Sequence, residues 1–583
     1  MMKTDLSSCS VLVSTLSTMK PYRVPAHPAP VDLRLASNEG PQVPPELRRF
    51  EDLKGDVVRC YPSGEELARE VARRSGLSAG RVLLTAGADD ALLRAIRLVA
   101  APGREILVPS PTFEMIERTI ELLGAKIRRV NWWRTGLPVE AILDALGSET
   151  VAVVLVSPNN PTGRAVSAVE MKRLMAGLGD RLLIVDQAYG EFADEDLTPL
   201  LIDQPNVVMI RTLSKAYGLA GLRIGIAIAP ADLLEWMRTI GHPYPVAGPS
   251  LAIAQQVVED AGAWQKQYLE RVRYERQEMV GLLAELGQRP MPSEANFVLS
   301  EFDNASWVAE GLAGLGVAVR RFPGRLRLKD SIRITCPGSE DGWQKLESGL
   351  RAVLSPQALL FDMDGVLADV TGSYRRAIRE TAGRFGVHVG TREIEAAKAA
   401  GNANNDWLLT WELVRSERPD VELDTVQETF EGIYQGTAEK PGLWQEEGLM
   451  ISRGLLEELA ARVPLAIVTG RPRRDAERFL ATFGLEDLFS TVVTMEDGPA
   501  KPDPFPVIRA LQQLGVERAW MVGDTPDDIR AARAAGVVPV GFAAQQPSSA
   551  FEQNLLRSGA ARVFTDLADL VGCLPATSSK GAD

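Results

Sequence analysis

Cysteine and histidine are scarce in this sequence of 583 residues. The chain has four cysteines, far apart and without a CxxC pair: Cys9, Cys60, Cys336 and Cys573. This pattern argues against a zinc site and suits a reducing compartment. The chain has three histidines: His27, His242 and His388. Histidine-based metal clusters and serine–histidine relays are therefore poor hypotheses for its chemistry.

Long apolar runs and an excess of basic charge are also lacking. No apolar run approaches the roughly 20 residues that a membrane-spanning helix needs. The segment "SVLVSTLST" near the start follows Asp5 and has neither a basic beginning nor a cleavage site of the signal-peptide type. A net charge of -13 disfavours non-specific binding to nucleic acids or anionic membranes. We therefore expect a cytoplasmic protein that acts on small molecules, with flexible tails at residues 1–20 and 576–583.

The length predicts several domains, and strand-like apolar runs alternate with helix-period segments throughout. The runs include "REILVPS", "VAVVLVSP", "RLLIVD", "NVVMIRT", "QALLFD", "PLAIVTG" and "AWMVGD". Such continuous runs are typical of parallel sheets covered on both faces, so an α/β fold is expected, with its chemistry beyond the carboxyl ends of the strands. Ser355–Pro356 breaks a helical pattern. This break predicts one domain over residues 21–355 and a second over residues 356–575.

A lysine follows a predicted buried strand in "VVMIRTLSKAYGLAGLRIG". Desolvation or a nearby cation can lower the pKa of Lys215, which suits imine formation with an aldehyde. Thr212, Ser214 and Arg223 around it could bind a phosphate group. The alternative is a helix start with capping hydroxyls and a solvated lysine.

Three further segments favour a cofactor site. Asp186 ends the run "LLIVD", where a buried aspartate can keep a pyridine nitrogen protonated, and Tyr189 follows it. Asn160 follows another strand, although an ordinary turn explains it equally well. Ala88 and Asp89 begin a helix, whose free N–H groups can bind phosphate. Taken singly, Asp186 and Asp89 could be ordinary helix-start residues.

Together these segments resemble the fold-type I pyridoxal-phosphate aminotransferases, which have a large mixed-sheet domain and a small α/β domain. "LASNEGP", "CYPSG", "TAGADDAL", "SPNNPTG", "VDQAYGEF", "TLSKAYGLAGLRIG" and "EANFVL" are similar to the histidinol-phosphate branch, over residues 20–354. The resemblance implies that Lys215 bonds to the cofactor aldehyde and moves a proton, that Asp186 faces the pyridine nitrogen, and that Phe113 stacks on the ring. It implies further cofactor contacts from Asn160 and Tyr189 to the ring hydroxyl, from Ala88, Asp89, Thr212, Ser214 and Arg223 to the phosphate, and from Tyr61 of a second subunit, hence a homodimer.

The resemblance also implies a substrate site. Arg333 would bind the carboxylate of glutamate, and Arg333, Arg320 and Tyr22 would bind the phosphate of histidinol phosphate. The alternative for Arg320 and its neighbour Arg321 is a solvated basic run. The sequence departs from the family pattern at Gln187, at Phe113 and in "NEGP". These departures leave the cofactor chemistry intact but weaken the assignment of the substrate, because close relatives act on aromatic amino acids or threonine phosphate.

Paired carboxylates appear in "LLFDMDGVLAD". Asp362 and Asp364 alternate along the chain, so both can face one cleft at the end of a strand. One carboxylate can attack phosphorus and the other can protonate the leaving oxygen. Acidic residues facing a phosphate need a cation, and hard oxygen ligands suit magnesium. Three later segments could complete such a site, with Thr469, Lys501, and Asp524 followed by Asp528, although each alone could be a cap or a turn.

This order of residues resembles the haloacid-dehalogenase superfamily over residues 357–573, with a Rossmann-like core and a helical cap at about 370–455. It implies that Asp362 is the nucleophile, Asp364 the acid and base, and that Thr469 and Lys501 stabilise the phosphoryl group. Magnesium would be held by Asp362, the Asp364 carbonyl and Asp524, supported by Asp528 or Asp527. In the cap, "NANNDW" could reach the substrate or simply cap a helix; it contains Asn402, Asn404, Asn405, Asp406 and Trp407.

An aminotransferase and a phosphatase in one chain suggest consecutive steps. We expect a bifunctional enzyme of histidine biosynthesis that makes histidinol phosphate from imidazole-acetol phosphate and then removes its phosphate. The known phosphatases of this superfamily for that step carry a Cys/His zinc site, which this sequence lacks. Two alternatives therefore stay open. The second half could hydrolyse a different small phosphate ester, or it could be a non-catalytic module that supports binding or dimerisation.

Overall fold

The computed structural model describes residues 19, 21, 26–401, 405–544 and 548–575. These residues form two compact units. The first contains Leu35–Asp303 and Arg320–Gln344. The second contains Ala26–Arg34, Asn304–Val319 and the chain from Lys345 onward. Each unit is an α/β assembly with its own sheet, as the alternating sequence pattern predicts.

The main sheet of the first unit has the strand order β2-β8-β7-β6-β5-β3-β4. Its strands are β2 (Val82–Ala86), β3 (Glu105–Ser110), β4 (Lys126–Asn131), β5 (Thr150–Val156), β6 (Leu182–Asp186), β7 (Val207–Thr212) and β8 (Ile224–Ile228). β8 runs antiparallel to both neighbours, whereas the other pairs are parallel. The sheet is therefore mixed, as expected for the large domain.

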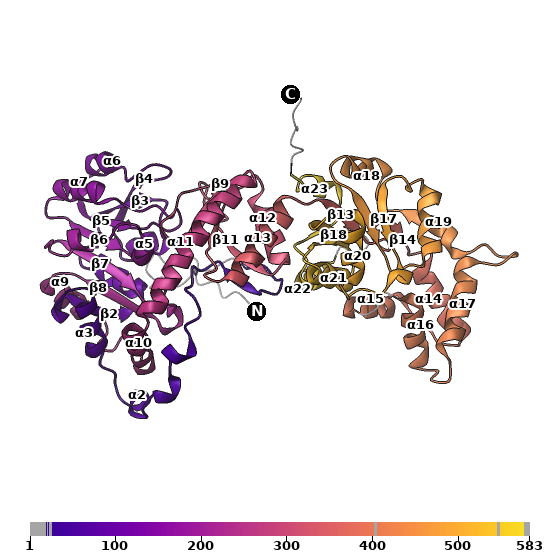
Figure 1. The fold of residues 1–583 in the computed structure, drawn as a ribbon, viewed down its shortest axis with the longest axis horizontal. Coiled ribbons are helices and arrows are strands. Elements are labelled where there is room, and N and C mark those ends of the chain that lie inside the picture. The colour runs from indigo at the N-terminus through magenta and orange to yellow at the C-terminus, as the bar shows by residue number, and fades with distance from the viewer. Residues whose placement is uncertain (1–18, 20, 22–25, 402–404, 545–547, 576–583) are drawn as a thin grey trace, which may run out of the picture. The chain divides into compact units, whose positions relative to one another are not determined.

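Both faces of this sheet are buried, which explains why its strands read as continuous apolar runs. Along β5, Val153 and Leu155 pack into one hydrophobic cluster, whereas Val154 and Val156 pack into another on the opposite face. The first cluster includes α3 (Glu65–Arg74), α7 (Ala168–Leu178) and α10 (Gly248–Asp260). The second includes α4 (Ala88–Arg97), α5 (Glu114–Leu122) and α9 (Ala231–Ile240). Figure 1 shows α3, α5, α7, α9 and α10 around the sheet.

A second sheet has the order β1-β11-β12-β10-β9. Its strands are β1 (Leu33–Leu35), β9 (Arg289–Pro290), β10 (Phe297–Glu301), β11 (Val317–Arg321) and β12 (Ser331–Thr335). The antiparallel register of β11 and β12 places Arg320 directly opposite Arg333. The remaining helices of this part of the sequence are α2 (Asp56–Arg59), α6 (Val139–Asp144), α8 (Thr198–Leu201), α11 (Gly262–Glu285), α12 (Ala305–Gly314) and α13 (Glu340–Leu354).

The sheet of the second unit is parallel, with the order β17-β16-β13-β18-β19-β20. Its strands are β13 (Ala358–Phe361), β16 (Leu465–Val468), β17 (Phe489–Val493), β18 (Ala519–Gly523), β19 (Val538–Phe542) and β20 (Arg562–Phe564). The covering helices are α18 (Arg453–Ala460), α19 (Arg473–Phe483), α20 (Phe505–Leu514), α21 (Pro526–Ala534), α22 (Ser549–Ser558) and α23 (Ala568–Val571). Because β16, β13 and β18 are neighbours, the residues that follow them meet at one edge of the sheet.

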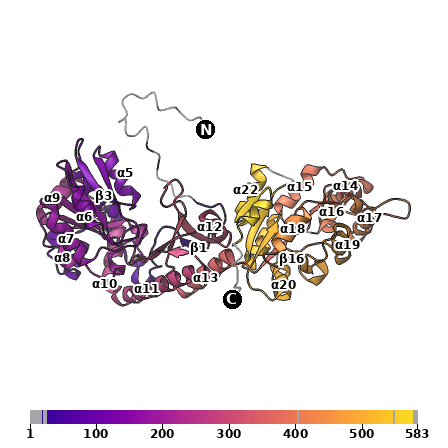
Figure 2. The same ribbon diagram turned by 90° about the horizontal axis from the view of Figure 1, so that it is seen from above.

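A helical insertion lies between the first and second strands of this core. The chain leaves the core through β14 (Ala368–Asp369) and returns through β15 (Gly448–Leu449), which pair antiparallel. Between them lie α14 (Tyr374–Arg384), α15 (Thr391–Ala400), α16 (Asp406–Arg415) and α17 (Leu423–Gln435). Figures 1 and 2 both show α14, α16 and α17 together at the end of this unit farthest from α22. The cap predicted at about 370–455 overlaps this insertion, and its role over the site stays a prediction.

A short connection lies at the boundary predicted between the two domains. α13 ends at Leu354 and β13 begins at Ala358, so Ser355–Pro356 lies in the short connection between them. In the part of the chain that the structure describes, no helix is both long enough and apolar enough to cross a membrane.

Candidate active sites

A cavity of about 370 Å³ opens at the carboxyl ends of β5, β6 and β7 in the first unit. It brings together nearly all residues predicted to hold a cofactor or substrate. They are Ala88, Asp89, Phe113, Asn160, Asp186, Tyr189, Thr212, Ser214, Lys215, Arg223, Arg320 and Arg333. These residues come from distant parts of the sequence, so their convergence is a property of the fold.

Lys215 lies three residues beyond β7 and points into this cavity. Its Nζ donates to the backbone carbonyl of Ser37 at 3.2 Å and lies 5.9 Å from the centre of the Tyr189 ring. Burial lowers the pKa of Lys215 to about 8, and the charge of Arg333 adds to this effect. A Cβ at Gly40 would lie only 2.0 Å from the carbonyl oxygen of Lys215, so the glycine of "NEGP" allows the two segments to approach closely. The amine is thus both accessible to an aldehyde and easily deprotonated.

Asp186 ends β6 and is buried in the same cavity. Its Oδ1 accepts a hydrogen bond from the Ala188 N–H at 2.9 Å. Burial raises the pKa of Asp186 to about 7, and the partial charge compensation from Lys215 is smaller than the desolvation. A carboxylate in this state gains from a cationic partner, so the position suits the protonated nitrogen of a pyridine ring.

The neighbouring polar groups suit the other substituents of such a ring. The Tyr189 hydroxyl accepts a hydrogen bond from Nδ2 of Asn38 at 2.9 Å, and burial raises its pKa. Ala88 and Asp89 form the first turn of α4, where free N–H groups bind anions. Thr212 donates to Oγ of Ser214 at 2.8 Å. These donors and the nearby Arg223 guanidinium form a cradle that fits a phosphate group.

Gly87 is required for this cradle. It has a φ of +82°, and a Cβ at this position would lie 2.7 Å from Nη2 of Arg223. Glycine therefore lets the guanidinium lie against the start of α4, where Nη2 of Arg223 also contacts Asp89 at 3.2 Å.

Three arginines line the far side of the cavity. Arg333 donates to Oδ1 of Asn160 and to the Ala36 carbonyl, both at 2.6 Å. Arg320 donates to Oε1 of Glu114 at 3.1 Å, and Nη2 of Arg325 lies 3.5 Å from Oε2 of the same carboxylate. Glu114 and Arg325 also line the cavity and were not predicted from the sequence. The signal available was the position of Glu114 directly after Phe113, in a motif already assigned to the cofactor.

Two predicted residues are not brought into this cavity by the described chain. Tyr22 lies outside the described residues. Tyr61 is 82% exposed and stacks on Tyr244, with ring centres 4.6 Å apart. Its contact with a cofactor in a second subunit stays a prediction.

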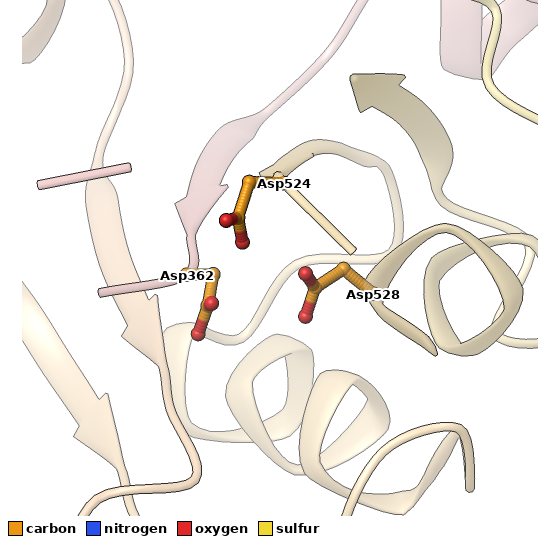
Figure 3. A group of neighbouring side chains, drawn as sticks. All are labelled: Asp362, Asp524 and Asp528. Atoms are coloured by element: carbon orange, nitrogen blue, oxygen red, sulfur yellow. The ribbon is translucent and has the colours of Figure 1, made fainter. Parts of the chain in front are cut away.

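A second candidate site lies at the edge of the parallel sheet in the other unit. Carboxylate oxygens of Asp362, Asp524 and Asp528 all lie within 4.8 Å of one another (Figure 3). Asp362 follows β13, Asp524 follows β18, and Asp528 lies in the first turn of α21. The Thr525 hydroxyl donates to Oδ2 of Asp528 at 2.6 Å and fixes its orientation.

Lys501 is the cation buried beside these acids. Its Nζ lies 2.7 Å from Oδ1 of Asp362 and 2.6 Å from Oδ1 of Asp528. It also donates to the Val468 carbonyl at 3.0 Å. Thr469, the next residue after Val468, is buried at the end of β16. Lys501 thus contacts the predicted nucleophile Asp362, and Thr469 follows the strand next to β13, while their roles stay predictions.

The electrostatics of the cluster favour a divalent cation. Burial raises the pKa of Asp362 to about 7 and that of Asp524 well above its ordinary value, and repulsion from Asp528 adds to both. Among the described residues, the buried Oδ1 of Asp524 has no hydrogen-bond partner. Gly365 has a φ of +75°, and its Cβ would lie 2.1 Å from Oδ2 of Asp524, so glycine makes room for this carboxylate. Buried carboxylate oxygens in this arrangement fit magnesium.

Asp364 takes no part in this carboxylate cluster. Its Oδ1 accepts a hydrogen bond from Nε of Arg471 at 2.5 Å, and it lines a small space of about 20 Å³ beneath the cap. This separation suits an acid and base that acts on the leaving group rather than a side-chain metal ligand. A metal contact through the Asp364 carbonyl stays a prediction. Arg471 was not predicted as a site residue, although it lies in "VTGRP", two residues after Thr469.

Cap residues complete the lining of that space. Asn405, Asp406 and Trp407 face it from the start of α16, together with Tyr374. The side chain of Asn405 accepts hydrogen bonds from the Trp407 and Leu408 N–H groups and so caps the start of α16. Asn405 therefore caps a helix and also lines the space, so the two alternatives given for this segment are compatible. Nζ of Lys398 lies 3.0 Å from Oδ1 of Asp406. Asn402 and Asn404 lie outside the described residues.

Comparisons with known proteins match the two parts of the chain that contain these sites. A family model described as Aminotransferase class I and II matches residues 32–346, and one described as Haloacid dehalogenase-like hydrolase matches residues 359–542. Histidinol-phosphate aminotransferase 1 of Nostoc sp. is 33% identical over 331 residues, which cover 55% of this chain and 91% of that protein. The crystal structure of histidinol-phosphate aminotransferase from Sinorhizobium meliloti in complex with pyridoxal-5'-phosphate has a TM-score of 0.54 and 26% identity, covering 60% of this chain and 99% of that one.

A third similarity concerns a protein with a different printed activity. An imidazoleglycerol-phosphate dehydratase of Phytophthora nicotianae is 46% identical over 245 residues. The match covers 38% of this chain and 54% of that protein, so the chain spans about half the length of this relative.

Proposed function

Because this chain belongs to the class I and II aminotransferases, and a haloacid dehalogenase-like hydrolase domain follows its aminotransferase domain, we propose that it is a bifunctional enzyme of histidine biosynthesis. The first site transfers an amino group from glutamate to imidazole-acetol phosphate and forms histidinol phosphate. The second site hydrolyses the phosphate ester of that product. The observation that carries the proposal is that the residues predicted for the first site line one cavity, whereas in the other unit Lys501 contacts Asp362 beside Asp524 and Asp528.

The first site uses pyridoxal phosphate, which supplies an electron sink for the substrate carbon when bound. Lys215 holds the cofactor and carries the proton to and from the substrate carbon. Asp186 keeps the ring nitrogen protonated, and the cradle at Ala88, Asp89 and Arg223 holds the phosphate. Arg333 and Arg320 bind the distal anion of the substrate, because a guanidinium accepts a carboxylate or a phosphate in the same bidentate manner.

The second site performs a two-step hydrolysis. A carboxylate oxygen of Asp362 attacks phosphorus while Asp364 gives its proton to the leaving ester oxygen. Water then attacks the aspartyl phosphate and returns a proton to Asp364, which releases inorganic phosphate. Thr469 and Lys501 orient the phosphoryl oxygens. Asp362, Asp524 and the Asp364 carbonyl, with Asp528 in support, would hold magnesium, which would supply positive charge beside the phosphoryl oxygens.

The printed names of the relatives support the substrate. One names histidinol phosphate and another names imidazoleglycerol phosphate, both of which are monophosphate esters of imidazole-bearing alcohols. The aromatic rings of Tyr61 and Tyr244 in the first unit are exposed. Because exposed apolar surface is typical of a protein interface, they support a homodimer.

One alternative substrate has specific support. The departures at Gln187, at Phe113 and in "NEGP" favour another phosphorylated amino compound, with a matching ester for the second site. A non-catalytic second domain is a poorer hypothesis because the chain carries Asp362, Asp364, Thr469, Lys501 and Asp524, and Lys501 contacts Asp362.

A phosphate-release screen tests the proposal. The holoenzyme with magnesium is offered histidinol phosphate and a panel of phosphate esters of similar size. We expect the highest kcat/KM with histidinol phosphate and no release by the Asp362→Asn variant. A preference for another ester would favour the alternative substrate. Absence of phosphate release from every ester would favour a non-catalytic second domain.

A further inference from the structure

Arg471 is a buried cation that contacts two carboxylates and two aromatic rings, although the predicted hydrolysis assigns it no role. Its side chain is 1% exposed, and its Nε donates to Oδ1 of Asp364 at 2.5 Å. Its Nη1 donates to Oε2 of Glu447 at 2.9 Å. The guanidinium also lies between two rings, 4.9 Å from the centre of Tyr374 and 5.4 Å from that of Phe479. Both carboxylates and both rings therefore fix its plane.

The backbone of Arg471 is fixed as well. Its N–H donates to Oγ1 of Thr469 at 3.2 Å, and its carbonyl accepts from Met495 at 3.1 Å. Pro472 follows it and restricts its conformation to extended values. The side chain therefore starts from a rigid position beside the predicted phosphoryl-binding threonine and reaches the predicted acid and base.

The partners of Arg471 belong to the cap as well as to the core. Glu447 directly precedes β15, at the point where the chain returns from the cap. The Tyr434 hydroxyl on cap helix α17 donates to Oε1 of Glu447 at 2.9 Å. Tyr374 lies in the first turn of cap helix α14. One guanidinium thus joins Asp364 to both connections of the cap.

A purely structural role does not account for this arrangement. Removing an arginine and two carboxylates from water costs several kcal/mol per ion, and an apolar cluster of similar volume is often at least as stable. In the described part of the chain, Nη2 of Arg471 has no hydrogen-bond partner, although it is buried and the residue lines the space beneath the cap. Asp364 remains 23% exposed toward that space. Nη2 of Arg471 and the Asp364 carboxylate are therefore available to a ligand that binds in this space.

We propose that Arg471 is a positioning residue of the hydrolytic site, which aims the carboxyl group of Asp364 at the leaving oxygen and does so through its attachment to the cap. This inference rests on the proposed hydrolysis. Its consequence is that proton transfer to the leaving oxygen depends on Arg471, whereas attack by Asp362 on phosphorus does not. The ester O–P bond breaks as the Asp362 O–P bond forms, and the proton passes from Asp364 to the departing alkoxide.

The dependence on the leaving group separates this role from a structural one. An alkoxide needs a proton to depart, whereas 4-nitrophenolate is stable without one. We therefore compare histidinol phosphate and 4-nitrophenyl phosphate at one pH with the magnesium-loaded full chain. The variants are Arg471→Lys and Glu447→Gln, with Arg473→Lys as control, because Arg473 pairs with Asp497 near the surface.

Arg471→Lys should lower kcat for the alkyl ester by about 100-fold, the usual contribution of a general acid, and kcat for the nitrophenyl ester by less than about 5-fold. Glu447→Gln should show the same selectivity to a smaller degree, and the control should match the wild type. The transaminase reaction of the same chain reports whether the first unit of each variant is folded, and near-ultraviolet circular dichroism compared with the wild type reports aromatic packing, to which Tyr374 and Phe479 contribute.

An equal loss for both esters in a folded Arg471→Lys variant would overturn the inference and leave the proposed hydrolysis intact. A normal rate for both esters would overturn it too. Absence of hydrolysis in the wild type would instead overturn the proposed function of the second site.

Discussion

Nζ of Lys501 lies 2.7 Å from Oδ1 of Asp362 and 2.6 Å from Asp528, so one buried ammonium group is shared by the predicted nucleophile and a neighbouring acid. An amide at position 362 preserves the shape of the side chain but cannot attack phosphorus. We predict that Asp362→Asn lowers phosphate release by at least about 1,000-fold, as expected when a nucleophile is removed. Transamination by the same variant should be unchanged, because Lys215 and its cavity belong to the other unit.

The measurement is a steady-state assay of both reactions on one preparation. A variant that loses both reactions together would contradict the assignment of two separate chemistries to two separate pockets.

The pKa of Lys215 predicts how the cofactor-free protein captures pyridoxal phosphate. Burial and the charge of Arg333 lower this pKa to about 8, and the neutral amine is the form that attacks an aldehyde. The rate of capture should rise with pH and reach half its maximum near pH 8. Stopped-flow visible absorbance measures it, with Lys215→Arg as the variant that should show no cofactor band. A midpoint near the ordinary lysine value of 10.5 would contradict the burial of this amine.

Asp186 predicts the pH dependence of stability in the cofactor-free protein. Its folded pKa of about 7 lies above the ordinary value of 3.8, so the folded state binds the proton more tightly. The stabilisation from this proton is complete below about pH 4 and is lost as pH rises through about 7. The difference corresponds to roughly 4 kcal/mol. Asp186→Asn should therefore unfold at a higher denaturant concentration than the wild type at pH 8, but not at pH 4.

The matched control is Asp194→Asn, because Asp194 is largely exposed. Bound cofactor should remove the difference at pH 8, since the ring nitrogen then supplies the cation. Equal midpoints for wild type and Asp186→Asn in the cofactor-free state at both pH values would contradict the uncompensated burial of this carboxylate.

Glu114 predicts a change in substrate affinity. Its carboxylate contacts Arg320 at 3.1 Å and Arg325 at 3.5 Å, and so it competes with a substrate anion for these two guanidinium groups. Glu114→Gln should lower KM for the phosphorylated substrate by about 3- to 10-fold, equivalent to about 1 kcal/mol. The effect on glutamate should be smaller because its carboxylate carries one charge rather than two.

Glu117→Gln is the control on the same helix, because Glu117 binds Arg129 and Ser110 rather than the two guanidinium groups beside the cavity. Competition experiments with inorganic phosphate on the cofactor-loaded protein give an independent reading of the same anion site. A higher KM for the phosphorylated substrate in Glu114→Gln would show that Glu114 contacts the substrate directly.

The sequence predicts the strands and the polar residues that follow them well, and the reason is physical. Buried parallel strands must be apolar on both faces, so "VAVVLV" and "LLIVD" are recognisable as β5 and β6 without knowledge of their neighbours. Polar residues that follow such strands converge at one edge of the sheet, so the sequence predicts that Asp362, Thr469 and Asp524 belong to one site. The break at Ser355–Pro356 was likewise a local signal.

Contacts that depend on distant pairing were not predictable. Glu114 and Arg325 read as ordinary surface charges, and only the packing of α5 beside the loop after β11 brings them to Arg320. Arg471 reads as a helix-start residue, and its ion pair with Glu447 requires the return path of the cap. The domain boundary at residues 355 and 356 and the complete set of site residues stay predictions until the variants are measured.

The central claim is that one chain performs transamination and then hydrolysis on the product. The direct measurement supplies imidazole-acetol phosphate and glutamate to the full chain loaded with pyridoxal phosphate and magnesium, and follows 2-oxoglutarate, histidinol phosphate, histidinol and inorganic phosphate over time. The account predicts histidinol and phosphate in amounts that match 2-oxoglutarate for the wild type, and accumulation of histidinol phosphate for Asp362→Asn. Equal accumulation of histidinol phosphate by the wild type and Asp362→Asn would contradict it.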